Sequence, residues 1–480
     1  MRTPHDHGVD LGDAADAADD PHHLSGHEGC SVCGLDLPFE LPDDLLDAAL
    51  QGKVVIFAGA GVSTESRRVY RATFAEQAAH EAGVDPAALT FPAIMSVYEE
   101  KFGRQQLLQK VRDRLEYVRT YPELQRMATR FHSELATAYF FDQIITTNWD
   151  TYFEDYTAAT PIVVAKDYAF WDIDGRKVIK LHGSMHNLGT IVATERDYKE
   201  CYRSLATGAI GGTFRHMLAT KQIVFVGYSF GDSDLNRVLK FVRKEMADVL
   251  PRSYIVSPHG YTGKDFPPER VITTDGSHFI RVLKHAAVQR GALRPDEDFD
   301  RVAELGRRLE HAHHEVSRSI DFRKFPAVLH TLSYQDGVLH AVDRIFALKS
   351  SGHYSRPHSA LHKAQRYEQM FKGAVRKREY IDAAYIDGFE NGLVALELDR
   401  EAANHTPLYW VWGSDSPMVK FADFKKELGR AGQLHKAATA EAERIVSNAP
   451  AGNMTMQHSP FIDIDQYMEA GAPRRNRKVA

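Results

Sequence analysis

The chain has 480 residues, a formal net charge of −6 and 43% hydrophobic residues. This balance is that of an ordinary folded protein, and the length predicts about two or three domains. The net charge creates no field that would gather nucleic acid over the whole surface. The longest apolar runs, 53–60 and 221–228, are far shorter than the roughly 20 residues that span a bilayer. Because there are only three cysteines and no basic start followed by an apolar stretch, we expect a cytoplasmic protein without disulfides.

The first 40 residues are rich in His, Asp, Ala and Gly and predict an arm without regular structure. They contain His27, Cys30 and Cys33 at H-x2-C-x2-C spacing, a pattern that can hold zinc. Cys201 is the only other cysteine, so a closed four-ligand site would need a further histidine. Zinc at this cluster is therefore the less favoured interpretation, and no metal ligand is assigned.

The first strong pattern is a strand that ends in a glycine-rich turn. A short helix with apolar residues on one side precedes residues 53–57, which are rich in β-branched side chains. The turn consists of Gly59, Ala60, Gly61, Val62, Ser63 and Thr64. Glycines allow a pyrophosphate to approach the backbone, the amides of a following helix can bind its oxygens, and the two hydroxyls can add hydrogen bonds or cap that helix. Two glycines alone do not complete the G-x-G-x-x-G pattern.

Three later segments also run from an apolar strand into polar residues or glycine. They are DQIITTNWD at 142–150, VIKLHGS at 178–184 and IVFVGYSFGD at 223–232. Two further short strands are expected at 253–257 and 271–274, preceded by an amphipathic helix at 235–249. This order predicts an α/β fold with a Rossmann-like, doubly wound parallel sheet, in which ligands bind at the carboxyl ends of the strands.

Four of these motifs together resemble the signature set of the sirtuins, in the same order. They are GAGVSTES at 59–66, TTNWD at 146–150, LHGS at 181–184 and GYS at 227–229. The resemblance covers residues 45 to about 290 and implies an NAD-binding domain. By motif position it assigns NAD binding to Gly59, Ala60, Gly61, Ser63, Thr64, Gly227, Tyr228 and Ser229. It assigns catalysis to Asn148, Asp150 and His182.

These three residue types suit cleavage of the bond between nicotinamide and ribose. That reaction passes through a ribose with oxocarbenium character, and nicotinamide leaves as a neutral group. The Asn148 amide can orient water or ribose hydroxyls, the Asp150 carboxylate can stabilise positive charge, and His182 can take or relay a proton. Each residue also has a structural interpretation, because Asn and Asp favour turns and a histidine at a strand end can bind backbone carbonyls. Gly227 can likewise serve close packing alone.

Two departures from the sirtuin pattern bear on the type of reaction. Protein-deacylating sirtuins carry a zinc module with two C-x-x-C pairs, whereas residues 65–275 contain only Cys201. Residues 67–70 replace the family's G-I-P-D-F-R, and residues 74–140 predict several helices where deacylases position an acyl-lysine peptide. The chain therefore resembles the sirtuin-like proteins of bacterial anti-phage systems. Members of that group hydrolyse NAD to nicotinamide and ADP-ribose and stay inactive until a partner or an oligomeric state releases them.

After residue 295 the motifs stop, and apolar residues at helical intervals predict a mainly helical C-terminal domain. The expected organisation is an arm at 1–40, a sirtuin-like NAD-binding catalytic domain at 41–295 and a helical interaction or oligomerisation domain at 296–480. The catalytic domain contains a helical insertion at about 71–140. The basic stretches at 356–378 and 474–478 are interpreted as a solvated helix face and a tail, so direct nucleic-acid binding is not favoured.

Three functions from different classes follow. The favoured one is an NAD glycohydrolase, a regulated effector that depletes NAD in anti-phage defence and abortive infection. The alternatives are an NAD-dependent protein deacylase or ADP-ribosyltransferase, and a non-catalytic scaffold that senses NAD or ADP-ribose. The resemblance implies NAD as substrate, a homo-oligomer and a partner such as a DNA-translocating ATPase or a nuclease, with no membrane partner.

Overall fold

The computed structural model describes residues 35–66, 69–230, 233–246, 250–263 and 266–448. His27, Cys30 and Cys33 and the basic residues at 474–478 lie outside the described residues. The chain divides into two compact units between Leu293 and Arg294, and Ser350–His353 belongs to the first unit.

The first unit contains a sheet of seven described strands, all parallel, in the order β3-β4-β2-β1-β5-β6-β7. The strands are β1 (Val54–Ala58), β2 (Gln143–Thr146), β3 (Thr160–Ile162), β4 (Lys177–Lys180), β5 (Gln222–Val226), β6 (Tyr254–Val256) and β7 (Val271–Ile272). The chain winds outward from β1 in both directions, so the predicted doubly wound parallel sheet is confirmed. β3 was not predicted, because a three-residue strand that contains a proline gives no recognisable pattern.

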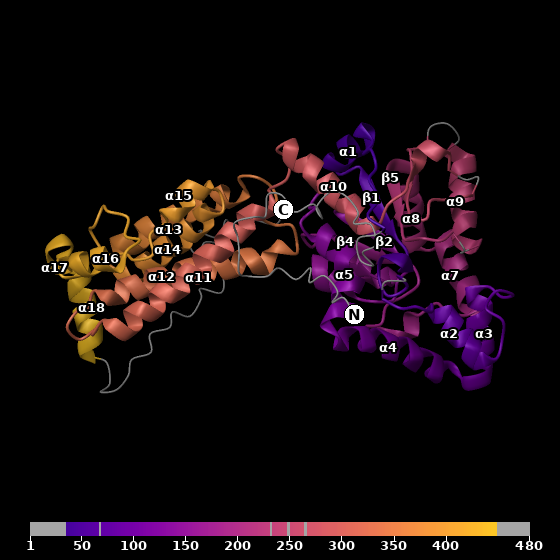
Figure 1. The fold of residues 1–480 in the computed structure, drawn as a ribbon, viewed down its shortest axis with the longest axis horizontal. Coiled ribbons are helices and arrows are strands. Elements are labelled where there is room, and N and C mark those ends of the chain that lie inside the picture. The colour runs from indigo at the N-terminus through magenta and orange to yellow at the C-terminus, as the bar shows by residue number, and fades with distance from the viewer. Residues whose placement is uncertain (1–34, 67–68, 231–232, 247–249, 264–265, 449–480) are drawn as a thin grey trace, which may run out of the picture. The chain divides into compact units, whose positions relative to one another are not determined.

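Helices cover both faces of this sheet, which explains why its central strands are apolar runs. Val54, Ile56 and Ala58 of β1 pack with α1 (Asp43–Leu50), α5 (Pro122–Ala136) and α10 (Gly276–Gln289). Val55 and Phe57 point to the other face and pack with residues of α7 (Glu195–Thr207), α8 (Ala209–Thr220) and α9 (Ser233–Met246). Figure 1 shows these two helical layers on either side of the sheet.

Four helices occupy the long connection between β1 and β2. They are α2 (Phe74–Ala82), α3 (Phe91–Phe102), α4 (Arg104–Thr120) and α5. α5 contributes to the core under the sheet, whereas α2, α3 and α4 share a separate apolar cluster. A capping box fixes the start of α2: Glu76 N donates to Thr73 Oγ1 at 3.2 Å, and Thr73 N donates to Glu76 Oε2 at 2.7 Å.

The segment directly after β1 is a 3-10 turn, Ala60–Val62, and not the start of an α-helix. The next α-helix along the chain is α2, which begins at Phe74 and is capped by Thr73. Of the two roles expected for the hydroxyls of Ser63 and Thr64, neither residue caps an α-helix, whereas Ser63 does add a side-chain hydrogen bond. The tight contact of this turn with the segment after β5 explains why the backbone stays in the turn conformation.

Two glycine turns meet at the carboxyl ends of β1 and β5. Gly59 N donates to Val226 O at 2.9 Å, and Gly61 N donates to Gly227 O at 3.0 Å. A Cβ atom on Gly59 would lie 2.5 Å from Gly227 O, and one on Gly227 would lie 2.6 Å from Val62 N. Gly227 also has a φ of +60°, a conformation that side chains rarely adopt. These glycines are thus required for the two turns to pack, whatever ligand the turns bind.

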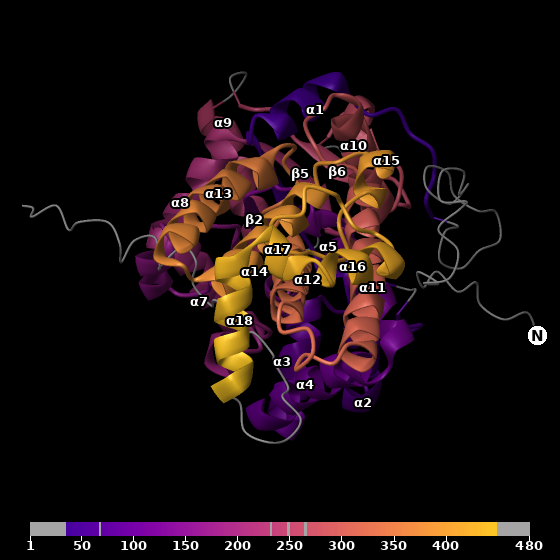
Figure 2. The same ribbon diagram turned by 90° about the vertical axis from the view of Figure 1, so that its left-hand side faces the viewer.

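The second unit is mainly helical, as predicted (Figure 2). Its helices are α11 (Asp296–Ser319), α12 (Val328–Lys349), α13 (Ser359–Lys377), α14 (Tyr380–Ala395), α15 (Arg400–Asn404), α16 (Phe421–Leu428), α17 (Ala431–Leu434) and α18 (Lys436–Asn448). Residues from α11, α12, α13 and α14 form its apolar clusters. None of the described helices of either unit combines the length and apolar content that a membrane crossing requires.

We expect Gly227→Ala to lower the free energy of unfolding by about 2–4 kcal/mol, because it adds backbone strain and a clash with the turn after β1. Denaturant unfolding of the purified chain measures this loss. Gly52→Ala is the matched control. Gly52 has a φ of +65°, but a Cβ atom added there would have no heavy atom within 4 Å, so only the conformational cost applies. Equal losses in the two variants would contradict the close packing of the two turns.

Candidate active site

The carboxyl ends of β1, β2 and β4 lie side by side because these strands are parallel neighbours. The register pairs Ala58 with Thr146, and Thr146 with Lys180. Thr146 Oγ1 donates to Ala58 O at 2.9 Å, and Leu181 N donates to Thr146 O at 2.9 Å. The glycine-rich turn, the TTNWD segment and the LHGS segment therefore leave the sheet at the same edge, where α/β folds bind ligands.

Ser63 joins the glycine-rich turn to two of the predicted catalytic residues. Its hydroxyl donates to Asp150 Oδ2 at 3.0 Å, and Asn148 Nδ2 donates to Ser63 Oγ at 3.2 Å. Ser63, Asn148 and Asp150 are buried, with exposed fractions of 1%, 5% and 4%. Asn148 Oδ1 is buried and has no hydrogen-bond partner among the described residues, so it can accept a hydrogen bond from a ribose hydroxyl or from water.

His182 lies two residues beyond the end of β4 and is buried. Its ring centroid is 5.0 Å from that of Tyr198 on α7, and its carbonyl oxygen accepts from Val192 N at 3.0 Å. The loop that follows reaches the Asn148 segment, because Met185 N donates to Trp149 O at 2.9 Å. The structure thus brings the loop of His182 into contact with the loop that carries Asn148 and Asp150.

The remaining predicted NAD-binding residues lie around the glycine-rich turn. Ala60 and Gly61 are exposed, whereas Thr64 is buried. The segment Gly227, Tyr228 and Ser229 follows β5 on the other side of β1, and the turn's backbone bonds to it. The exposed backbone of the turn is therefore accessible to a phosphate group, while its other side serves packing.

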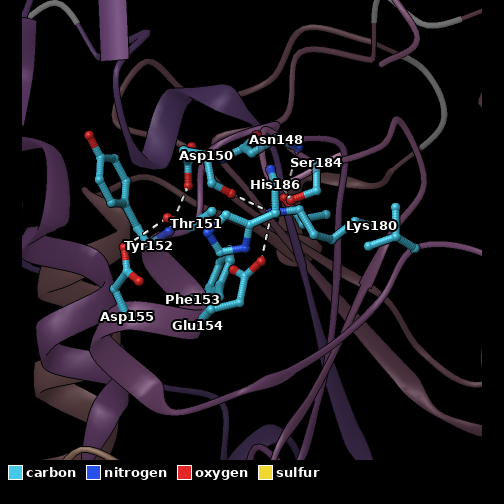
Figure 3. Close-up of polar contacts among 12 residues, drawn as sticks. Asn148, Asp150, Thr151, Tyr152, Phe153, Glu154, Asp155, Lys180, Ser184 and His186 are labelled. Atoms are coloured by element: carbon cyan, nitrogen blue, oxygen red, sulfur yellow. Dashed lines mark hydrogen bonds and ion pairs between the residues drawn. The ribbon is translucent and has the colours of Figure 1, made fainter. Parts of the chain in front are cut away.

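The buried Lys180 and the partly buried Glu154 lie next to the Asp150 segment, and neither was predicted as a site residue from the sequence (Figure 3). The Lys180 ammonium donates to the backbone oxygen of Asp150 and pairs with Glu154 Oε1 at 3.1 Å. Burial raises the pKa of Glu154, and the Lys180 charge opposes that rise. A lysine in a strand that is expected to be buried on both faces was the sequence feature that could have indicated Lys180.

His132 of α5 is a second buried polar residue that the sequence did not indicate. Its ring centroid lies 4.4 Å from that of Phe153 and 5.6 Å from that of Tyr152, and neither ring nitrogen has a partner among the described residues. Burial lowers the pKa of His132 to about 4; the charge of Asp150 opposes the shift, and that of Lys180 adds to it. His132 is therefore neutral at neutral pH.

A cavity of about 140 Å³ borders Asp150. It is lined by Arg112, Leu115, Glu116 and Arg119 of α4, by Asp150, Thr151 and Tyr152, and by Met185 and His186. Arg119 donates to Thr151 Oγ1 at 2.5 Å and to Asp155 Oδ2 at 2.9 Å. These bonds connect α4 to the first turn of α6 (Tyr152–Thr157) and to the residue before it.

Comparison with known proteins agrees with this arrangement. Residues 142–280 match the model of a SIR2-like domain, and this range contains three of the four motifs, TTNWD, LHGS and GYS, so the match supports the resemblance drawn from them. The chain is also 27% identical over 207 residues to the "NAD(+) hydrolase ThsA" of Cytobacillus dafuensis. This match covers 42% of the chain and 40% of that relative, so the chain matches less than half of the relative's length.

Within the described ranges, no group of His, Cys, Asp and Glu side chains is arranged to hold a metal ion.

We expect the buried His132 to make the fold sensitive to acid. Because its pKa is lowered from 6.5 to about 4 in the folded state, the unfolded chain binds more protons between these values. Its contribution is fully present above pH 6.5 and is lost as the pH falls toward 4, a loss of about 3 kcal/mol. Urea unfolding at several pH values should show this extra loss in the natural chain relative to His132→Leu. Parallel pH profiles of the two proteins would contradict the assignment.

Proposed function

We propose that this protein hydrolyses NAD to nicotinamide and ADP-ribose. The observation that carries the proposal is the buried cluster of Ser63, Asn148 and Asp150, which joins the glycine-rich turn to the Asn–Asp motif beside the loop of His182. The SIR2-like domain and the similarity to an NAD(+) hydrolase support NAD as the substrate.

In this proposal the pyrophosphate lies against the exposed side of the turn, at Ala60 and Gly61, and Asn148 Oδ1 accepts a hydrogen bond from the nicotinamide ribose or from the attacking water. The bond between the ribose C1′ and the nicotinamide nitrogen breaks, and its electron pair stays with nicotinamide. The Asp150 carboxylate stabilises the positive charge on the ribose. Water then bonds to C1′, and His182 accepts its proton.

Helix α4 lines the cavity next to Asp150, and this favours water over a peptide as the acceptor of the ribose. Four of the lining residues come from α4, a helix of the long connection between β1 and β2, where a deacylase would position an acyl-lysine peptide. Together with the similarity to an NAD(+) hydrolase, this supports hydrolysis over deacylation.

The proposal includes control of the activity, because an enzyme that consumes NAD without restraint would harm its own cell. We propose a cytoplasmic effector of anti-phage defence that depletes NAD in abortive infection. A homo-oligomer, or a partner such as a DNA-translocating ATPase or a nuclease bound through the helical second unit, would release the activity. The resemblance to sirtuin-like defence proteins supports this part of the proposal.

We expect Asn148→Ala and His182→Ala each to lower the rate of NAD hydrolysis by a factor of about 10²–10⁴, the range for loss of an acid–base or positioning group. Chromatography of NAD, nicotinamide and ADP-ribose after incubation measures the rate, with the protein alone and with the proteins encoded beside it. His285→Ala is the matched control, because His285 is an exposed histidine of the same unit. Circular dichroism establishes that each variant is folded.

The same assay separates the alternatives. Equal amounts of nicotinamide and ADP-ribose support hydrolysis, whereas label that moves from NAD to protein or acyl groups indicates a transferase or deacylase. NAD binding without turnover under every condition indicates a sensing scaffold. Full activity in both folded variants would refute the assigned site.

A further inference from the structure

The loop between β2 and α6, residues 147–151, carries Asn148 and Asp150 but has no regular secondary structure. We infer that Lys180 is a positioning residue that holds this loop, and with it the Asp150 carboxylate, in its working place above β4. The kinetic consequence rests on the proposed NAD hydrolysis. The structural claim, that Lys180 fixes the loop, stands independently of it.

Asp150 is held at three of its oxygens, each by a different element. Lys180 of β4 donates to the backbone oxygen, Tyr152 N of α6 donates to Oδ1 at 3.2 Å, and Ser63 of the glycine-rich turn donates to Oδ2 at 3.0 Å. The Lys180 contact is the one of the three that holds the backbone of Asp150, and it comes from a residue of the sheet (Figure 3). The other two contacts orient the carboxylate once the backbone is in place.

The same ammonium also fixes the start of α6. Lys180 Nζ lies 3.1 Å from Glu154 Oε1, and Glu154 is in the first turn of this helix. The side chain of Lys180, the last residue of β4, therefore contacts both the loop and the helix that follows it. The neighbouring bond from Met185 N to Trp149 O, at 2.9 Å, holds the loop from the same side.

The energetics favour a positioning role over a stabilising one. The Lys180 side chain is 0% exposed and that of Glu154 is 10% exposed, so both charges lose most of their hydration. Glu154 Oε2 is buried without a partner among the described residues, and burial raises the pKa of this carboxyl. Apolar residues in place of such a buried pair are often neutral or stabilising. Apolar residues, however, would not supply a hydrogen-bond donor for the Asp150 carbonyl.

The test is the double variant Lys180→Met/Glu154→Met in the full-length protein. Removing both charges together avoids an unpaired buried ion, so we expect the double variant to melt above Lys180→Met alone, and below the natural chain only by the loss of the donor to the Asp150 carbonyl. We expect kcat for NAD hydrolysis to fall by about 10–10²-fold, because small displacements of a catalytic group have effects of this size. KM should change less than kcat, since the glycine-rich turn that faces the pyrophosphate is not substituted.

Arg176→Lys is the matched control. Arg176 is a buried cation next to the opposite end of β4, and its guanidinium donates to the carbonyls of Phe141, Thr157, Leu135 and Ala138. None of these carbonyls belongs to the loop at 147–151. This variant should lose stability while it retains the kcat of the natural protein, which separates a general loss of packing from a displaced Asp150.

Hydrogen exchange gives a readout that does not depend on activity. Amides of residues 147–152 should exchange at least about tenfold faster in the double variant, while those of β1 and α5 keep their rates. If the natural protein does not hydrolyse NAD, the proposed function fails and the exchange result alone decides the role of Lys180. A folded double variant with unchanged exchange in this loop, or with unchanged kcat in an active protein, would overturn the inference.

Discussion

The parallel pairing of β1 with β2 on one side and β5 on the other is the constraint on which the site depends. Parallel neighbouring strands have their carboxyl ends at the same edge of the sheet, so the loops that follow β1, β2 and β5 all begin at this edge. The glycine turns after β1 and β5 can then pack backbone to backbone, and Ser63 can reach the segment after β2. A hydroxyl, an amide and a carboxylate that are distant in the sequence thereby become neighbours.

Burial then determines the state of the groups beneath this edge. The buried ammonium of Lys180 is stabilised by the Glu154 carboxylate and by the Asp150 carbonyl oxygen. Burial also lowers the pKa of His132, so this side chain is uncharged. The buried charge next to the loop at 147–151 is therefore that of the Lys180–Glu154 pair. The side chains of Ser63, Asn148 and Asp150 are buried and are fixed by hydrogen bonds.

The sequence predicted the parts of this site that local patterns encode. Short apolar runs that end in glycine or polar residues identified six of the strands, and the order of four motifs placed Asn148 and Asp150 near His182. It could not predict the 3-10 turn after β1, because the turn depends on contact with Gly227, far along the chain. Lys180 and His132 were not predicted for the same reason: the groups that surround them lie on other elements, and the local sequence does not show which polar residue of a strand or helix will be buried.

Ser63 and Asn148 also explain how such a closed cluster could accept a substrate. Ser63 uses its hydroxyl proton for Asp150 and a lone pair for one N–H of the Asn148 amide. The Asn148 carbonyl oxygen is not engaged within the described residues, and leaving a buried acceptor unsatisfied costs about 1–3 kcal/mol. A ribose hydroxyl at this atom would recover that cost without breaking an existing bond. Binding at Asn148 can therefore add to the network that positions Asp150 and does not have to compete with it.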